Sequence, residues 1–162
     1  MAAPVPTARG TPAGTRIDDG FRTLITFALN PTINFWEKEV MPPGYDGGDP
    51  VSTSTMHNLT FRTMNPRKLV TMSECTVLVA YDPFLFSQSG NNLFGLLNRK
   101  TTVTVTFPDG TTLAFFGYLQ KAKPNACKEG DQPDMEITII VTNQDPVSGV
   151  ETGPTLTNVP GT

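Results

Sequence analysis

The sequence predicts a mainly β protein: an antiparallel β-sandwich or barrel with one flanking α-helix, a long loop and extended termini. Three observations support this prediction: segments in which apolar and polar residues alternate, turn-forming residues between them, and ends rich in Pro, Gly and Thr. The length of 162 residues fits one domain. We expect an N-terminal extension over residues 1–17, a domain over residues 18–143 and a C-terminal extension over residues 144–162.

The first two strands are predicted over residues 20–29 and 33–40. In the second, Ile33 and Phe35 share one face while Trp36 lies on the other, as expected for a period of two. Only Asn-Pro-Thr separates the two segments, which is short enough for a hairpin.

A long loop is predicted over residues 41–56, where two adjacent prolines and paired glycines interrupt any regular pattern. Loops of this length in compact domains are usually functional or disordered. A short strand over residues 59–64 and a long strand over residues 69–81 follow. One face of the long strand carries the residues Cys75, Val77, Val79 and Tyr81.

The helical segment is predicted over residues 83–98. Asp82 is a suitable N-cap and Pro83 suits the first helical position. Because residues 87–90 read Ser-Gln-Ser-Gly, we expect either one broken helix or two short helices packed on a sheet.

The clearest local pattern is a β-hairpin. Residues 102–107 alternate Thr with Val and Phe, residues 108–110 form a Pro-Asp-Gly turn, and residues 111–119 return. Gly117 in the return strand indicates a bulge or a close approach of another backbone. A last alternating strand is predicted over residues 135–142.

Composition excludes several functional classes. The net charge of −3 and the isoelectric point near 5.0 lack the basic footprint of nucleic-acid binding. The N-terminus has no basic segment followed by an apolar one, so we expect no signal peptide. No stretch approaches the ~18 apolar residues of a membrane span. We therefore expect no membrane association.

The sequence also lacks an arrangement of residues for catalysis. His57 is the single histidine and has no carboxylate or cysteine beside it. Asp46 and Asp49 are explained by turn formation, without a metal ion. Cys75 is expected to be a buried apolar residue and Cys127 a free thiol, and their pairing would require neighbouring strands. We expect no enzyme, no cofactor and no metal site.

Apolar surface is in surplus for so small a fold. The predicted strand that contains Phe116 and Tyr118 is apolar on both faces, and Trp36 adds a further large side chain. Strands with two apolar faces need two coverings, of which a partner can supply one.

An ordered series of motifs between residues 20 and 143 resembles the tail tube proteins (major tail proteins) of tailed bacteriophages. Each motif is short, and the resemblance rests on their order and spacing. The motifs are Phe35-Trp36-Glu37-Lys38, Pro42-Pro43-Gly44-Tyr45-Asp46-Gly47-Gly48-Asp49, the Ser/Thr stretch ending at Met56, Ala80-Tyr81-Asp82-Pro83, Thr106-Phe107-Pro108-Asp109-Gly110, Phe116-Gly117-Tyr118-Leu119, and Glu129 to Pro133.

The resemblance implies a structural virion protein, assembled in the bacterial host cytoplasm. Such proteins form hexameric rings that stack into a hollow tube, through which DNA passes without specific binding. Implied partners are further copies of the chain and other tail proteins: tape measure, tail terminator, baseplate or tip, and sheath if the tail is contractile. The loop over residues 41–56 and both extensions would contact neighbouring subunits. Together with the surplus apolar residues, this gives nine candidate interface residues: Trp36, Pro42, Pro43, Tyr45, Asp46, Asp49, Met56, Phe116 and Tyr118.

Three other functions are open to such a sequence. A capsid decoration or cement protein is also rich in β-structure and has extended arms. A carbohydrate-binding module would need a row of exposed aromatic residues, for which Trp36 is the one strong candidate. A hydrolase would need an acid/base pair, which the sequence lacks.

Overall fold

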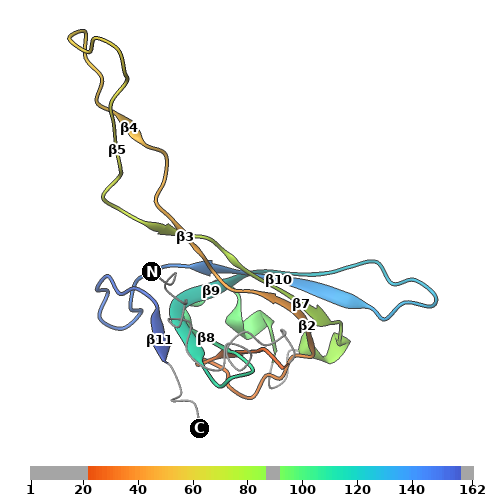
Figure 1. Cartoon of the computed structure of the whole chain (residues 1–162). Coiled ribbons are helices and arrows are strands. Elements are labelled where there is room, and N and C mark those ends of the chain that lie inside the picture. Colours follow the sequence, from red (N-terminus) through yellow and green to blue (C-terminus); the bar gives the residue numbers. More distant parts are fainter. Residues whose placement is uncertain (1–21, 87–91, 158–162) are drawn as a thin grey trace, which may run out of the picture.

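A computed structural model describes residues 22–86 and 92–157 of the chain. Its body is a seven-stranded sheet in the order β1-β8-β9-β10-β7-β2, with β11 beside β9, and all pairs are antiparallel (Figure 1). The predicted mainly β, antiparallel fold is confirmed. The strands are β1 (Leu24–Phe27), β2 (Glu37–Met41), β7 (Cys75–Ala80), β8 (Thr101–Thr106), β9 (Thr112–Pro124), β10 (Asp134–Val141) and β11 (Thr155–Thr157).

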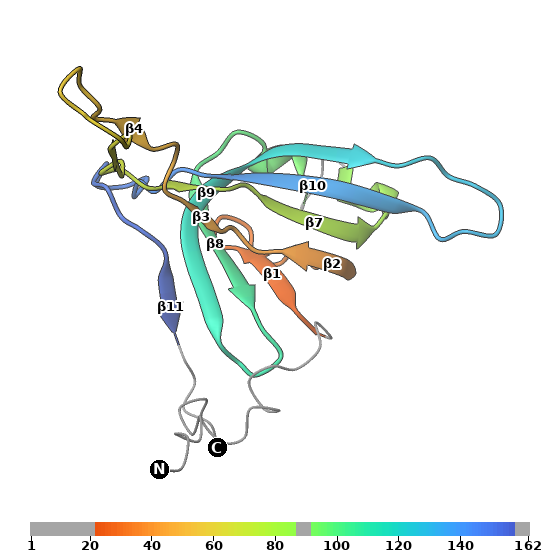
Figure 2. The ribbon, with the colours of Figure 1, turned by 45° about the horizontal axis from the view of Figure 1, so that its top comes forward.

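Strand β9 belongs to two layers. Its first half pairs with β8 as far as Gly117, and its second half, from Gly117 to Pro124, pairs with β10. Figure 2 shows β9 curving from the layer that contains β8 to the layer that contains β10. One layer therefore contains β1, β8 and the first half of β9. We refer to the other, made of the second half of β9 with β10, β7 and β2, as the four-stranded layer.

Gly117 allows this bend. A Cβ atom at this position would lie 2.5 Å from the carbonyl oxygen of Ile140, which is a backbone atom and cannot move aside cheaply. The register between β9 and β10 also shifts between Thr138 and Ile139, because Thr138 pairs with Lys121 and Ile139 with Leu119. The extra residue, Gln120, is a β-bulge that bends the strand further. Of the two alternatives predicted for Gly117, the close backbone approach occurs there, whereas the bulge lies three residues further on, at Gln120.

The core lies between the two layers and follows the predicted alternation. In β7 the residues Cys75, Val77 and Val79 are buried, as predicted, whereas Tyr81 beyond its end is half-buried. Phe27 and Phe35 meet edge to face with ring centroids 6.0 Å apart. The other strands supply further buried side chains: Ile25, Val103, Val105, Phe115, Leu119, Met135, Ile137 and Ile139.

The predicted hairpin between the first two strands is wrong. β1 and β2 do not pair with each other: β1 pairs with β8, β2 pairs with β7, and the two strands lie at opposite ends of the strand order. Ile33 and Phe35 are buried in the irregular segment before β2. One side chain connects β1 to β2: the amide of Ile25 donates a hydrogen bond of 3.0 Å to Oε1 of Glu37.

The predicted α-helix over residues 83–98 is replaced, where the structure describes it, by two 3₁₀-helices. These are η1 (Pro83–Phe86) and η2 (Phe94–Leu96), and residues 87–91 lie outside the described part. Asp82 accepts a hydrogen bond from the Phe84 amide, at 3.0 Å, as its predicted capping role requires. Leu93 and Leu96 are buried, and their spacing of three suits a 3₁₀ turn.

The described part of the C-terminal extension folds back on its own chain. Asp145 begins a turn, accepting a hydrogen bond from the Val147 amide at 2.8 Å, and Gln144 pairs with Glu151. β11 then extends the sheet along β9, with Leu156 opposite Leu113. Intrachain pairing therefore holds residues 144–157 against the rest of the chain.

The bend at Gly117 can be tested by substitution. We expect Gly117→Ala to lower the free energy of unfolding by about 1–3 kcal/mol, because the methyl group would press on the Ile140 carbonyl. Gly153→Ala is the matched control, since a Cβ there meets nothing within 4 Å. Denaturant unfolding followed by circular dichroism measures both. Equal stability of the two variants would contradict the role given to Gly117.

Candidate assembly surfaces

A two-stranded arm leaves the sheet between β2 and β7 and projects far from the body (Figure 1). It comprises residues 42–74, which we call the arm. Two short ladders hold it together: β3 (Tyr45–Asp46) with β6 (Thr71–Met72), and β4 (Val51–Ser52) with β5 (Met64–Asn65).

The arm continues the β2–β7 hairpin in register. Met41 pairs with Thr76, and Tyr45 pairs with Met72, so both sides advance by four residues. Between these pairs, the Gly44 amide donates to Oγ of Ser73 at 2.7 Å, and the Ser73 amide donates to the carbonyl of Gly44 at 3.0 Å. The four-stranded layer therefore anchors the arm through a nearly continuous ladder.

This arrangement corrects the predicted boundaries of the loop and strands. The predicted loop over residues 41–56 is one side of the arm, except that Met41 ends β2. Of the strand predicted over residues 59–64, only Met64 lies in a strand, β5. The long strand expected over residues 69–81 divides into β6 in the arm and β7 in the body. Because no layer of the described chain packs on the arm, its strands show no buried face that a periodic pattern could reveal.

The arm tip, residues 54–62, exposes large apolar side chains on a defined turn. Met56 is 100% exposed, Leu59 99% and Phe61 80%. Asn58 shapes the turn: its Oδ1 accepts from the Thr55 amide at 2.8 Å, and its Nδ2 donates to the Phe61 carbonyl at 2.9 Å. An apolar cluster without cover is typical of an interaction site.

The opposite end of the β2–β7 hairpin also exposes aromatic rings. Trp36, just before β2, is 75% exposed, and Phe84, soon after β7, is 83% exposed. The Trp36 carbonyl accepts a hydrogen bond of 2.8 Å from the amide of Ala80, the last residue of β7, so Trp36 lies at this end of the hairpin. Phe84 follows four residues after Ala80. The molecule thus presents apolar groups at the two opposite ends of one hairpin.

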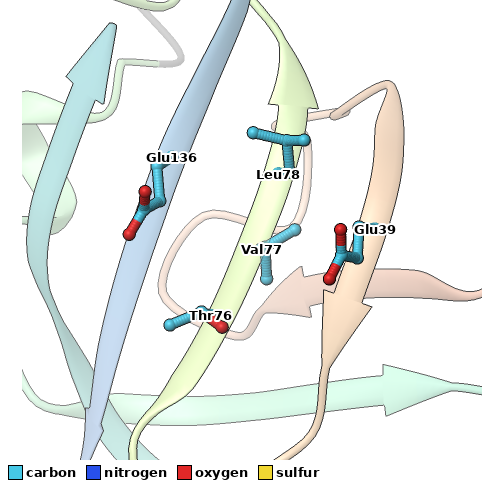
Figure 3. Close-up of a pocket in the computed structure, with 5 residues that line it drawn as sticks. All are labelled: Glu39, Thr76, Val77, Leu78 and Glu136. Carbon is cyan, nitrogen blue, oxygen red and sulfur yellow. The ribbon is translucent and has the colours of Figure 1, made fainter. Parts of the chain in front are cut away.

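The outer face of the four-stranded layer carries both charged and apolar side chains. In Figure 3, Glu39 on β2 and Glu136 on β10 lie on either side of β7, where Thr76, Val77 and Leu78 line a shallow depression between them. On the same layer, Nζ of Lys38 lies 3.9 Å from Oδ2 of Asp134.

Six of the nine candidate residues lie on the arm. Five of them precede the arm tip, and two of these five are not exposed. Pro43 is buried and Pro42 half-buried at the arm base, so Pro43 serves packing. Tyr45 is 71% exposed. Asp46 accepts a hydrogen bond from the Gly48 amide at 2.8 Å, and the Asp49 carbonyl accepts one from Nε of Arg67 at 2.9 Å.

The remaining candidates occupy different surfaces. Met56 lies at the arm tip and Trp36 at the opposite end of the hairpin. Phe116 and Tyr118 are half-buried on the outer face of β9, where Tyr118 pairs with Ile140. The structure does not bring the nine residues together into one site.

Sequence reasoning missed four exposed apolar residues on the returning side of the arm. By type these residues suit a core strand. The segment around them is rich in Ser, Thr and Asn, and this composition is the signal that indicates an exposed segment. They are Leu59, Phe61, Leu69 and Val70, with exposures of 99%, 80%, 79% and 56%.

Two kinds of site are absent from the described residues. Within residues 22–86 and 92–157, no three His, Cys, Asp or Glu side chains gather closely enough to hold a metal ion. The same part of the chain contains no helix of the length and apolarity needed to cross a membrane.

No protein-family model and no curated protein sequence matches the chain. Solved structures do match it. A chain of the anti-feeding prophage baseplate, symmetrised six-fold, aligns with a TM-score of 0.52 at 6% identity over 74% of this chain and 87% of that one. A chain of the native gene transfer agent virion aligns with a TM-score of 0.57 at 10% identity, over 87% and 99%.

A third match is a chain of the sheath-tube complex of an extracellular contractile injection system, PVC, in its extended state. Its TM-score is 0.56 at 13% identity, and the alignment covers 93% of this chain and 99% of that one. This protein has the fold of phage-tail-like structural components. The likeness extends over nearly the whole length of those chains, and it agrees with the resemblance to tail tube proteins that the sequence motifs indicate.

The two cysteines differ in environment and are both free. Cys75 is buried in β7, and burial raises the pKa of its thiol to about 12. Cys127 is exposed in the segment between β9 and β10. Because the thiolate is the reactive form, only Cys127 is available to a reagent near neutral pH.

We therefore expect a thiol reagent at pH 8 to modify one cysteine per folded chain and two in denaturant. Cys127→Ser should abolish the native reaction and leave the reaction in denaturant at one. Colorimetric thiol titration measures both. Rapid modification of Cys75 in the folded protein would contradict its assigned burial.

Proposed function

We propose that this chain is a structural virion subunit that assembles with copies of itself into stacked hexameric rings, forming the hollow tube of a phage tail through which DNA passes. The observation that carries the proposal is the arm: an ordered extension of the four-stranded layer whose tip exposes Met56, Leu59 and Phe61. A monomer gains nothing from holding such a cluster in water, whereas a neighbouring subunit can cover it.

The four-stranded layer offers two edges for ring formation. β2 ends the strand order on one side. On the other side, the second half of β9 pairs with β10, and beyond Leu119 its opposite edge meets no backbone of the described residues. Exposed edges invite pairing with another chain. Joining the β2 edge of each copy to the β9 edge of the next would close the layers into one barrel. Six-fold symmetry is the symmetry applied to the baseplate structure that contains one of the similar chains.

Stacking follows from the two ends of the β2–β7 hairpin. The arm tip and the end with Trp36 and Phe84 are different surfaces, so a contact between them is head-to-tail. Head-to-tail contacts that do not close into a ring generate open filaments. We place the arm tip of one ring against the next ring, with Trp36 and Phe84 as part of the surface that receives it.

The same arrangement gives the tube its partners. The last rings would meet the tape measure, tail terminator, baseplate or tip proteins, and a sheath in a contractile tail. The outer face of the four-stranded layer would line the lumen. It carries charges of both signs: Glu39 on β2, Glu136 on β10, and Lys121 and Lys123 on β9. A lining without a basic excess would let DNA pass, because phosphates bind where cations cluster.

The proposal predicts the effect of removing the arm tip. Thr53 and Thr63 are paired, with 2.9 Å between the Thr53 amide and the Thr63 carbonyl. An Asn-Gly turn that replaces residues 54–62 can therefore close the ladder. We expect this variant to fold with the circular dichroism spectrum and melting temperature of the unaltered chain but to form no filaments in electron micrographs.

A triple variant separates the effect of the apolar side chains at the arm tip from the effect of the length of the arm. Met56→Ser with Leu59→Ser and Phe61→Ser keeps the arm and should also prevent stacking. Val147→Ser is the control, because Val147 is 94% exposed but lies in the C-terminal turn. Normal filaments from both arm variants would contradict the role of the tip. If the unaltered protein forms only monomers or trimers that bind a capsid lattice, the chain is a decoration protein instead.

A further inference from the structure

A row of charged side chains crosses the outer face of the four-stranded layer from one edge to the other. Lys123 on β9 pairs with Glu136 on β10, Glu136 pairs with Leu78 on β7, and Leu78 pairs with Glu39 on β2. Directly paired residues lie on the same face of a sheet. The row therefore begins with a cation at the β9 edge and ends with an anion at the β2 edge.

The two ends of the row face outward at the edges of the layer, where no described residue of opposite charge lies beyond them. Glu39 is opposite the apolar Leu78, and it forms no ion pair with another described residue. At the other edge, Lys123 is opposite Glu136, whereas Lys121 is opposite the uncharged Thr138 and adds a second cation to this edge. Lys121 and Lys123, which we call the lysine pair, are both exposed, as is Glu39.

The directions of the strands fit a join between copies. Neighbours across the layer alternate in direction, so β9 and β2 at its two edges run opposite to each other. When identical layers stand side by side in a ring, β2 of one copy is antiparallel to β9 of the next. The same face of every layer then points to the lumen, and Glu39 comes to the edge that carries the lysine pair.

We propose that Glu39 of one copy forms an ion pair with the lysine pair of the neighbouring copy and thereby limits the register between their strands. The occupant of this edge is a second copy of the chain, and the inference rests on the ring proposed above. Lys123 continues the row of Glu39 without stagger, and Lys121 meets it after a slip of two residues.

Register needs such a device at this boundary. A slip of one residue would turn every side chain of a strand to the wrong face, so the apolar pattern already excludes it. A slip of two residues keeps the faces and is not excluded by that pattern. Because Lys121 and Lys123 lie two residues apart on the same face of β9, Glu39 meets a cation in the unslipped register and after one slip of two residues. Larger slips leave Glu39 without a cation, so electrostatic complementarity limits the join to these two registers.

Charge reversal tests the pair. Glu39→Lys should reduce the fraction of chain assembled into rings about tenfold or more, because like charges would face each other at every boundary. Lys121→Glu combined with Lys123→Glu should have the same effect. The protein with all three substitutions should assemble again, since the attraction is restored with the signs exchanged. Sedimentation velocity on the full chain measures assembly, and circular dichroism confirms that each variant folds.

Single reversals of Lys121 and Lys123 identify which lysine dominates. Lys128→Glu is the matched control, because Lys128 is exposed but lies beyond β9, in the segment leading to β10, and should leave assembly unchanged. The inference is overturned if folded Glu39→Lys assembles normally, or if the triple variant stays dissociated although it is folded. Failure of the unaltered chain to form rings would instead reject the proposed function, so the two failures are distinguishable.

Discussion

The close contact between Gly117 and the Ile140 backbone is the constraint on which the rest of the molecule depends. Gly117 pairs with Thr101 on one side and with Val141 on the other, so it is the residue at which β9 passes from one layer to the next. With a side chain there, β10 could not approach as closely. The bend and the bulge after it leave the second half of β9 with an unpaired edge, and that edge together with β2 bounds the four-stranded layer.

The arm depends on the same layer. Its ladders keep the register of the β2–β7 hairpin, so the layer sets the direction in which the arm leaves the body. Local hydrogen bonds hold the arm tip: Asn58 shapes a turn that exposes Met56, Leu59 and Phe61 instead of burying them. The chain therefore separates two tasks. The sandwich is stable through its buried alternating strands, and the arm and sheet edges present groups that no other described residue covers.

The sequence predicted the parts of the fold that have a buried face. Val103, Val105, Ile137 and Ile139 alternate with polar residues because one side of their strands meets the core. The hairpin of β8 and the first half of β9 was predicted nearly to its ends, but the continuation of β9 to Pro124 was not predicted. The ends of the arm strands could not be predicted in the same way. Both faces of these strands are exposed, so their sequence lacks the alternation of apolar and polar residues that one buried face produces. The separation of β1 from β2 was also hidden, since it depends on which edges β7 and β8 occupy. Trp36 and Met56 were expected at an interface by type, whereas Leu59 and Phe61 were assigned to a strand that does not form there.

Cryo-electron microscopy of the purified, unaltered chain tests the central claim most directly. The account predicts hollow filaments built from stacked six-fold rings, with the outer faces of the four-stranded layers lining the channel and each arm tip covered by the next ring. A preparation that contains only monomers or small discrete particles at high protein concentration, with the arm tip uncovered, would contradict it.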